Sequence, residues 1–184
     1  MGSMSKVLAI LAAVVALAAV GASSASAAAF TSTGGPIEGT STTTQVFTFN
    51  GLSVECNAAR SVGTATAPTM SELRLEQAFS ECKAVFGILG KVNLEMSLVK
   101  VGLTANQTLD FLNTVTINVP LVGCHLTIAP QGPLSSVALS SWPVAVSSLT
   151  GITYTSSGGL CGTSGTNGTF SGTTEYHGPV SRDP

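Results

Sequence analysis

Four cysteines carry the most definite chemistry in this chain: Cys56, Cys82, Cys124 and Cys161. An even number of cysteines in an exported chain is typical of disulfides, and four cysteines allow three pairings. Sequential pairing, Cys56 with Cys82 and Cys124 with Cys161, is favoured because it would fasten each half of the chain separately. A zinc site is the alternative, but the chain has no C-x-x-C motif and only His125 adjoins a cysteine. We therefore predict two disulfides and no metal.

Catalysis by a nucleophile would need a base, and His125 and His177 are the only histidines. A Ser-His-Asp triad would have to recruit Asp110 or Asp183, and no pattern in the sequence places either beside a histidine. Paired carboxylates could hydrolyse glycosides, but most of them alternate with apolar residues and should face solvent. These carboxylates are Glu55, Glu72, Glu76, Glu81, Glu95 and Asp110. We predict a protein that is not an enzyme, with no catalytic residue and no cofactor.

A glycine-rich segment, GTSGTNGT at Gly162–Thr169, is similar in composition to loops that bind phosphate. It has no Lys before its Thr, and it is expected between strands rather than ahead of a helix, so it lacks the helix dipole that such loops use. Its spacing is also one residue short of the G-x-S-x-G nucleophile elbow. A wide turn around Cys161 is the favoured interpretation.

The N-terminal segment, residues 1–29, has the order of features of a secretory signal peptide. Lys6 precedes the apolar run Val7–Val20, and the small residues SSASAAA follow. Cleavage could follow Ala27 or Ala29. A retained membrane anchor is the alternative, but the apolar run is shorter than the ~20 residues that a spanning helix needs. The mature protein is therefore predicted to be secreted, that is, extracellular.

The sequence does not identify a partner, but the charge of the mature chain limits the classes of partner that it could bind. Without Lys6, six basic residues face nine acidic ones, a net charge near −3. So few charges, with no basic cluster, argue against nucleic acid and against membrane contact after signal cleavage. Contact with a cell wall or a glycan stays open. Little Lys or Glu occurs outside Arg60–Lys100, and the abundant Ser, Thr, Gly and Val suit strands and turns.

The clearest structural signal is the hairpin Gln45–Cys56, QVFTFNGLSVEC. Asn50-Gly51 tolerates the two positive φ angles of a type I′ turn. With that pair at the tip, Phe47 opposes Val54 and Phe49 opposes Leu52. Directly opposed residues share a face, so the hairpin should present one apolar surface that ends in an inward Cys56.

Other segments also alternate with a period of two, which predicts about ten short strands in all. Ser71–Phe79 places Leu73 and Leu75 on one side, which favours a strand, although its Glu, Leu, Arg and Gln favour a helix by propensity. Cys124–Ala129 repeats the pattern of the hairpin. Lys91–Val101 reads as one strand. The residues expected on its core face are Val92, Leu94, Met96 and Leu98.

Three further segments complete the expected layout. Phe30–Thr44, rich in Thr, Ser and Gly, reads as a loose N-terminal arm or an edge strand. Ser80–Gly87 reads as a turn locked by Cys82. Thr169–Tyr176 reads as the last strand, with Gly172 as a bulge. The fold predicted for residues 30–184 is a single all-β domain, an antiparallel two-layer sandwich or flattened barrel.

Three segments resemble a loosely defined group of exported, disulfide-containing, β-rich proteins of high-GC Gram-positive bacteria that have no characterised activity. The segments are Val54–Cys56 (VEC), Glu81–Gly87 (ECKAVFG, with an inserted Val85) and Gly151–Thr173. The resemblance spans Val46–Gly178, with a poorly matched middle. It implies a β-rich fold and export from the cell, and it implies no activity.

The function that fits these features is a secreted or cell-surface-associated protein of structural or adhesive type, acting through Thr- and Ser-rich strand faces. The alternative is a β-sandwich module that binds a carbohydrate or another small ligand, a function argued from the fold class alone. Sugar sites usually offer exposed aromatic side chains, for which Trp142, Tyr154 and Tyr176 are the candidates.

Overall fold

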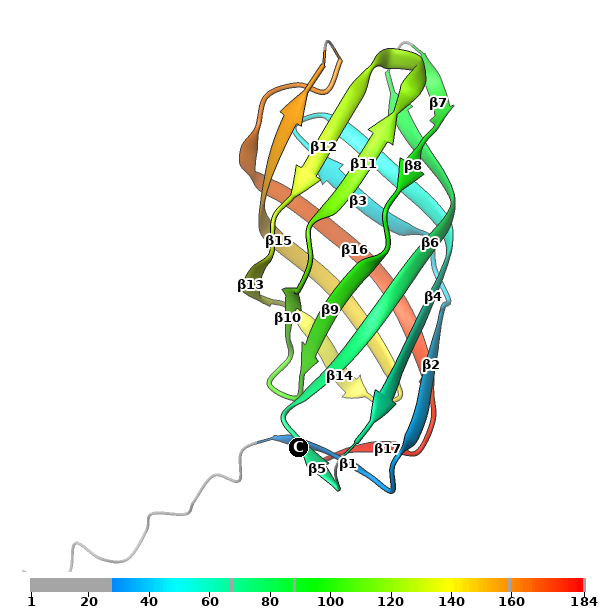
Figure 1. Cartoon of the computed structure of the whole chain (residues 1–184), viewed down its shortest axis with the longest axis vertical. Helices are drawn as coiled ribbons and strands as arrows, with labels where there is room; N and C mark the ends of the chain where they lie inside the picture. Colours follow the sequence, from blue (N-terminus) through cyan, green and yellow to red (C-terminus); the bar gives the residue numbers. More distant parts are fainter. Residues whose placement is uncertain (1–27, 67, 88, 159, 184) are drawn as a thin grey trace, which may run out of the picture.

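Antiparallel strands make up most of the chain that the structure describes (Figure 1). This computed structural model describes residues 28–66, 68–87, 89–158 and 160–183. The predicted signal peptide therefore lies outside the described residues, apart from Ala28 and Ala29. The all-β prediction is confirmed, and the number of strands is larger than the ten expected.

The strands follow one another along the chain with short turns between them. They are β1 (Ala29–Ser32), β2 (Gly35–Ser41), β3 (Gln45–Phe49), β4 (Leu52–Ala65), β5 (Thr69–Met70), β6 (Glu72–Phe86), β7 (Gly90–Asn93), β8 (Glu95–Met96), β9 (Val99–Thr104), β10 (Thr108–Phe111), β11 (Val115–Val119), β12 (Cys124–Ile128), β13 (Gln131–Ser135), β14 (Val137–Ser141), β15 (Val144–Ser157), β16 (Gly165–His177) and β17 (Val180–Asp183). One 3-10 turn, η2 (Pro120–Val122), joins β11 to β12.

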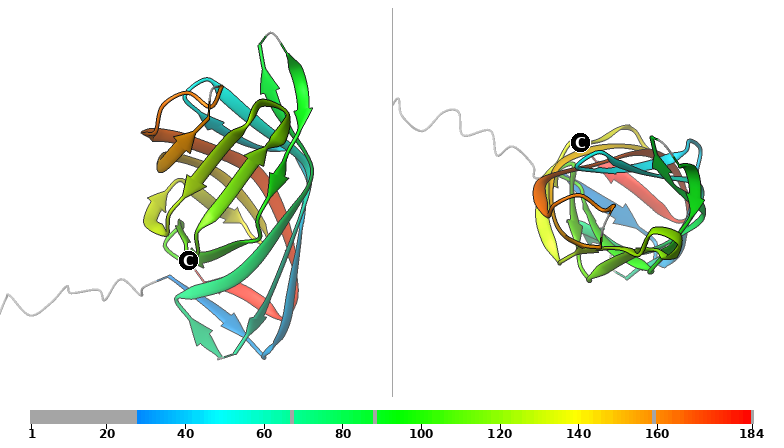
Figure 2. Two further views of the ribbon diagram at one scale, coloured as in Figure 1. Left: turned by 45° about the horizontal axis from the view of Figure 1, so that its top comes forward. Right: turned by 90° about the horizontal axis from the view of Figure 1, so that it is seen from above.

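Fourteen strands form one large sheet, in the order β13-β10-β9-β6-β4-β2-β16-β15-β12-β11-β8, with β3, β7 and β14 paired beside this path. The sheet curls around a single hydrophobic core, so that its two halves face each other (Figure 2). Gln131 brings β13 against β15, because its side-chain amide donates to the Thr153 carbonyl and accepts from the Thr153 amide, each over 2.8 Å. The arrangement is consistent with a β-sandwich and is not a simple closed barrel.

The hairpin β3–β4 has the predicted register. Gln45 pairs with Cys56, Phe47 with Val54 and Phe49 with Leu52. Asn50 and Gly51 at the tip have φ angles of 40° and 91°, as a type I′ turn requires. The apolar face of the hairpin is buried, since none of its five apolar residues exposes more than 3% of its surface.

Strands β4 and β6 are longer than predicted and pair over most of their length. The segment expected as a turn, Ser80–Gly87, continues β6 as far as Phe86, so that prediction is wrong. In each strand every second residue faces the core, and this alternation shifts by one residue partway along the strand. The shift follows Cys56 in β4 and Phe79 in β6, which lie close together in the paired strands. Glu81 has a φ of 54° at this point, and the pairing keeps one register through it. The two strands thus twist together at this level. A prediction that assumes a strict period of two cannot detect such a shift.

Two other predictions for single segments are wrong. Lys91–Val101 is divided among β7, β8 and β9, because β7 and β9 pair with β6 whereas β8 pairs with β11. As a result Leu98 is 43% exposed and Val99 takes the buried place. The expected loose arm forms β1 and β2, and β2 lies inside the large sheet between β4 and β16.

The C-terminal segment also departs from the prediction. The last strand is β17 rather than Thr169–Tyr176, which is part of β16. Gly172 is not a bulge, because it pairs with Ser147 within a regular register. A side chain on Gly172 would overlap Gln45, whose buried amide donates to the Thr43 and Thr173 carbonyls. Gly172 is therefore needed for close packing.

Both predicted disulfides are present: Cys56–Cys82 and Cys124–Cys161. The first joins two directly opposed residues of β4 and β6. The second ties the glycine-rich loop before β16 to the first residue of β12. Each bridge restricts the unfolded chain within its own half of the sequence.

A small sheet, in the order β17-β1-β5, lies across one end of the large sheet (Figure 1). Phe30 of β1 is fully buried there and contacts Trp142, with 5.2 Å between the ring centroids. The Trp142 indole donates to the Val180 carbonyl over 3.1 Å, and Arg182 donates two hydrogen bonds to the Ala105 carbonyl. The first and last described strands thus close this end, which we call the base.

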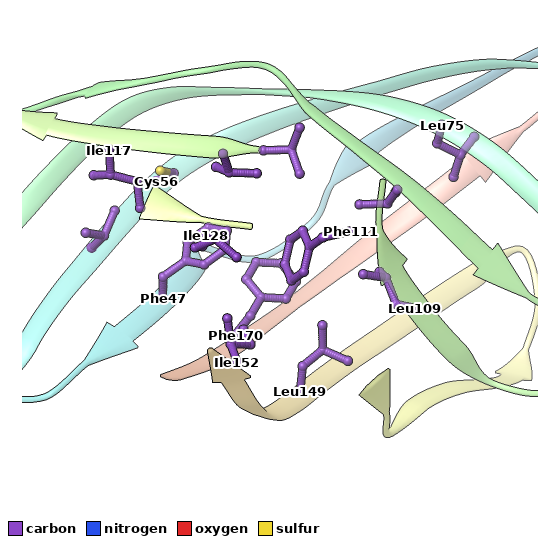
Figure 3. Packing of buried hydrophobic residues seen from close by; sticks show 14 of the residues in the cluster. Phe47, Cys56, Leu75, Leu109, Phe111, Ile117, Ile128, Leu149, Ile152 and Phe170 are labelled. Carbon is purple, nitrogen blue, oxygen red and sulfur yellow. The ribbon is translucent and has the colours of Figure 1, made fainter. Parts of the chain in front are cut away.

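The core draws aromatic side chains from strands on both sides of the curled sheet (Figure 3). Phe47 of β3 lies 4.6 Å from Phe170 of β16 and 5.4 Å from Phe79 of β6, measured between ring centroids. Phe47 thus contacts β16, which pairs with β3, and β6, which lies beyond β4, so one buried ring links three strands of the large sheet.

Replacing Phe47 by Ala should lower the free energy of unfolding by about 3–5 kcal/mol, since it removes a buried aromatic ring and leaves a cavity. Thr48→Ala, at an exposed position of the same strand, should change it by less than about 0.5 kcal/mol. Urea unfolding of the oxidised protein measures both. Equal effects of the two substitutions would contradict the register described for the hairpin.

Candidate binding surfaces

The charged residues gather on one side of the molecule. Strands β9, β6, β4 and β2 are consecutive in the large sheet and carry most of the charged side chains. Opposite charges lie close together there, with Arg60 3.0 Å from Glu38 and Lys100 2.8 Å from Glu76. This outer surface carries exposed ion pairs, which contribute little to stability.

The outward surface of another group of strands in the curled sheet carries no formal charge. Residues 111–174 contain no Asp, Glu, Lys or Arg, and they supply β11, β12, β14 and β15, which lie together in the sheet. We call the outward residues of these strands the uncharged face. Its exposed members with side chains are Thr116, His125, Ala138, Ser140, Ser141, Val146, Ser148, Thr150, Thr153, Thr155 and Ser157, and Thr127 is half-buried among them.

Threonines form a row across the uncharged face. Thr116 of β11 pairs with Thr127 of β12, which pairs with Thr155 of β15. Neighbouring antiparallel strands lie ≈ 4.7–4.9 Å apart, so the three side chains follow one another at that spacing. Each hydroxyl can donate one hydrogen bond and accept others. The row therefore presents a regular series of neutral hydrogen-bonding groups.

A pocket of about 410 Å³ opens at the base, between the end of β2, the β14–β15 turn and the β16–β17 turn. Trp142 and Tyr176 stack in its wall with 5.5 Å between their centroids. The indole N–H is already bonded to the Val180 carbonyl, so Trp142 offers carbon atoms to the pocket. The pocket is lined by Ile37, Trp142, Pro143, Tyr176, His177, Gly178, Val180 and Ser181.

The structure shows where the three aromatic candidates from the sequence lie. Trp142 is half-buried and packs between Phe30 and Tyr176. Tyr154 is buried against Phe49 at the other end of the core. Of these three aromatic residues, Trp142 and Tyr176 line the pocket and Tyr154 does not. None of the three has a fully exposed ring face.

The histidines do not lie in a catalytic arrangement within the described residues. His125 is exposed on β12, opposite Asn118 and Ser157. His177 has a side chain that is 64% exposed, and its Nε2 atom lies 4.0 Å from Glu175. Asp110 lies against Gly132 of β13, and Asp183 pairs with Ala29 at the base.

Of the carboxylates singled out from the sequence, Glu55, Glu72, Glu76 and Glu81 lie on β4 and β6 of the charged side, whereas Glu95 lies on β8 beside Asn118 of β11, and Asp110 lies on β10. Glu55 pairs with Lys91 over 2.5 Å, Glu72 lies 3.6 Å from Arg74, and Glu81 is exposed. Each ion pair satisfies a carboxylate with a neighbouring cation, and no group of three or more metal-ligating side chains occurs among the described residues.

The glycine-rich segment is divided between a loop and a strand. The loop holds the buried Cys161 and crosses to the tip of the β3–β4 hairpin, where the Asn50 amide donates to the Thr163 hydroxyl over 2.8 Å. Gly165 already begins β16. The wide turn predicted for Gly162–Thr169 is therefore found only beside the disulfide, at Gly162–Ser164, because Gly165–Thr169 belong to β16.

Comparison with known proteins gives no relatives: no family model, curated protein or solved structure matches the chain significantly. No helix among the described residues is long and apolar enough to span a bilayer. The fold and the bridges define a disulfide-linked, antiparallel all-β protein, and its surfaces carry the functional argument.

The sequence interpretation missed two features of these surfaces. The charge-free stretch 111–174 is visible in the sequence and could have been found by mapping the charges. The pocket could not, because Ile37, Trp142 and Tyr176 come from segments that only the sheet order brings together.

Tyr176 gives the base a measurable pH response. Burial raises its pKa to about 12, and hydrogen bonds with Ser61 and Gln77 partly oppose this shift. A tyrosine in the unfolded chain titrates near ~10. Stability should therefore be complete below pH ~10 and fall by roughly 2 kcal/mol as the pH rises towards 12, because the unfolded state releases the proton first.

Urea unfolding between pH 9 and pH 11.5 measures this fall, and Tyr176→Phe should remove the part that comes from Tyr176. An unchanged pH dependence in Tyr176→Phe would show that the phenol is not buried as described.

Proposed function

We propose that this chain is a secreted or cell-surface-associated, non-enzymatic protein of structural or adhesive type, and that the uncharged face is its adhesive surface. The observation that carries this proposal is the separation of charge, with ion pairs on one side of the sheet and a hydroxyl-rich surface without formal charge on the other.

Two features support the location outside the cell. Disulfides form and persist in oxidising compartments, and both pairs of cysteines are bridged. The sequence before Ala28 has the charge, apolar run and small residues of a signal peptide. Ala28 and Phe30, which lie where that leader is expected to end, pack on the core.

The uncharged face suits a neutral polysaccharide. A polymer that offers hydroxyl groups can exchange hydrogen bonds with the Thr116, Thr127 and Thr155 row, and no charged group has to lose its hydration. The disulfides and the curled sheet hold these strands in place, which limits the ordering cost of binding. Many weak contacts along one polymer would then add up by multivalency.

Binding to insoluble neutral polysaccharides, such as cellulose and chitin, should therefore be almost independent of salt between 0.05 and 1 M NaCl, because charge contacts would be screened over that range. The double variant Thr116→Lys/Thr155→Lys should lose at least fivefold in the bound fraction, since each Lys brings a hydrated charge into the contact. Pull-down of the oxidised protein with each polymer measures this.

Thr64→Lys is the matched control, because Thr64 is also an exposed threonine in a strand but lies on the charged side. It should bind as the unchanged protein does. Binding that disappears in 1 M NaCl, or that Thr64→Lys weakens as much as the double variant, would assign adhesion to the charged side and contradict the proposal.

A second candidate function is binding of a small carbohydrate in the base pocket. The pocket supports it because its size is within the usual range for ligand sites, and because it combines the apolar surface of Trp142 and Pro143 with the polar side chains of His177 and Ser181. A sugar ring has an apolar face and a polar rim, which is the same combination.

A glycan array tests this second candidate. His177→Ala should reduce the signal at least fivefold without changing the unfolding midpoint, because the His177 side chain is largely exposed. Trp142→Ala should abolish the signal and also lower stability. An array with no signal, or a signal that persists in His177→Ala, would exclude a sugar held by these residues.

A further inference from the structure

Three leucines protrude at one end of the molecule. Leu121, Leu160 and Leu89 are the most exposed large apolar residues among those described, at 75%, 54% and 51%. Each occupies a separate connection: Leu89 precedes β7, Leu121 lies in η2, and Leu160 lies in the loop before β16. Turns usually carry Gly, Pro, Asn, Asp or Ser, so three leucines at turns are unusual.

These three connections lie side by side. The backbone of Gly158 lies against the Gly123 carbonyl, which places the loop of Leu160 beside the turn of Leu121. Strand β7 contacts η2, which places Leu89, just before β7, near the same turn. Figure 1 shows these connections at one end of the molecule, whereas β1 and β17, the first and last described strands, lie at the opposite end. We call Leu89, Leu121 and Leu160 the leucine tips.

The leucine tips are held rather than loosely attached. Gly123 ends η2 with a left-handed backbone, φ 58° and ψ 34°, and its amide donates to the Pro120 carbonyl. The Cys124–Cys161 bridge anchors the residues next to Leu160 and close to Leu121. The connection of Leu89 joins two paired strands and is closed by the pairing of Phe86 with Gly90. Each exposed leucine therefore lies on a connection that is tied to the sheet at this end.

Charge is balanced around the leucine tips. The connections that carry them, residues 87–90, 120–123 and 158–164, contain no charged residue. Lys91, next to the Leu89 connection, is paired with Glu55 over 2.5 Å, and Lys83 of β6 opposes the same Glu55 and donates to the Asn93 side chain. The leucine connections themselves thus offer no cluster of basic residues that would attract anionic lipids.

We propose that the leucine tips dock the protein on a lipid bilayer by inserting into the interface between headgroups and acyl chains. Three separate side chains on rigid turns would need three matched sockets on a protein partner, whereas a fluid lipid phase accepts them without matched shape. The balanced charge points to uncharged or zwitterionic headgroups. The sequence prediction of no membrane contact relied on the lack of basic residues, and apolar insertion does not require them. This docking is independent of the uncharged face.

Flotation with phosphatidylcholine vesicles tests the proposal on the exported protein. The bound fraction should change less than twofold between 0.05 and 0.5 M NaCl or when a fifth of the lipid is phosphatidylglycerol. Leu89→Ser/Leu121→Ser/Leu160→Ser should reduce it at least tenfold. The matched control, Val62→Ser/Leu98→Ser/Leu112→Ser, removes three exposed aliphatic residues away from the tips and should bind normally. Because all variants share the same N-terminus, a retained leader would affect them equally.

Fluorescence shows which end inserts, because Trp142 is the only tryptophan and lies at the base. In vesicles with brominated acyl chains, Leu121→Trp in a Trp142→Phe background should be quenched at least twofold, and the unchanged protein should not be. No flotation, equal loss in both triple variants, or quenching of Trp142 would overturn the proposal. Dimerisation lost only in the leucine variant, without vesicle binding, would instead assign the tips to a second copy of the chain.

Discussion

The structure depends on the register of β4 between its neighbours β3 and β6. Phe47 and Phe49 of β3 can reach the core only if they oppose Val54 and Leu52. On the other side of β4, Cys56 can be bridged to Cys82 only if the two residues are directly opposed. A shift by one residue would turn both phenylalanines to solvent and separate the cysteines, so packing and covalent chemistry require the same register.

The curl of the sheet then decides how the surfaces are divided. Since β4 and β6 change their core-facing residues together near Glu81, they wind around the core and carry the sheet with them. Strands that are consecutive in sequence after Asp110 thereby reach the side opposite the ion pairs. The uncharged face, the base pocket and the leucine tips occupy a side and two opposite ends of one rigid scaffold, which lets a single domain offer separate contacts.

Much of the local structure could be predicted because it rests on neighbours in sequence. Asn50-Gly51 and the alternation around it specify one hairpin, and Cys124, Leu126 and Ile128 are buried as their spacing indicates. The predictions failed where strands exchange partners. Leu98 continues the alternation of Leu94 and Met96, yet it is exposed because the chain leaves β11 and joins β6 at Val99. The local alternation of apolar residues cannot predict that change of pairing partner.

The amino-acid sequence by itself determined the all-β class, the hairpin and the supply of charge, since each depends on residue type and short spacing. It favoured the sequential cysteine pairing among three, and the structure decided for it. Only the tertiary structure decided that β2 lies inside the sheet, that Trp142 meets Phe30 and Tyr176 at the base, and that Leu89, Leu121 and Leu160 share one end. The physical reason is that these contacts join segments far apart in the chain. Their positions follow from the order and curl of the strands, which are set by burial of the whole core.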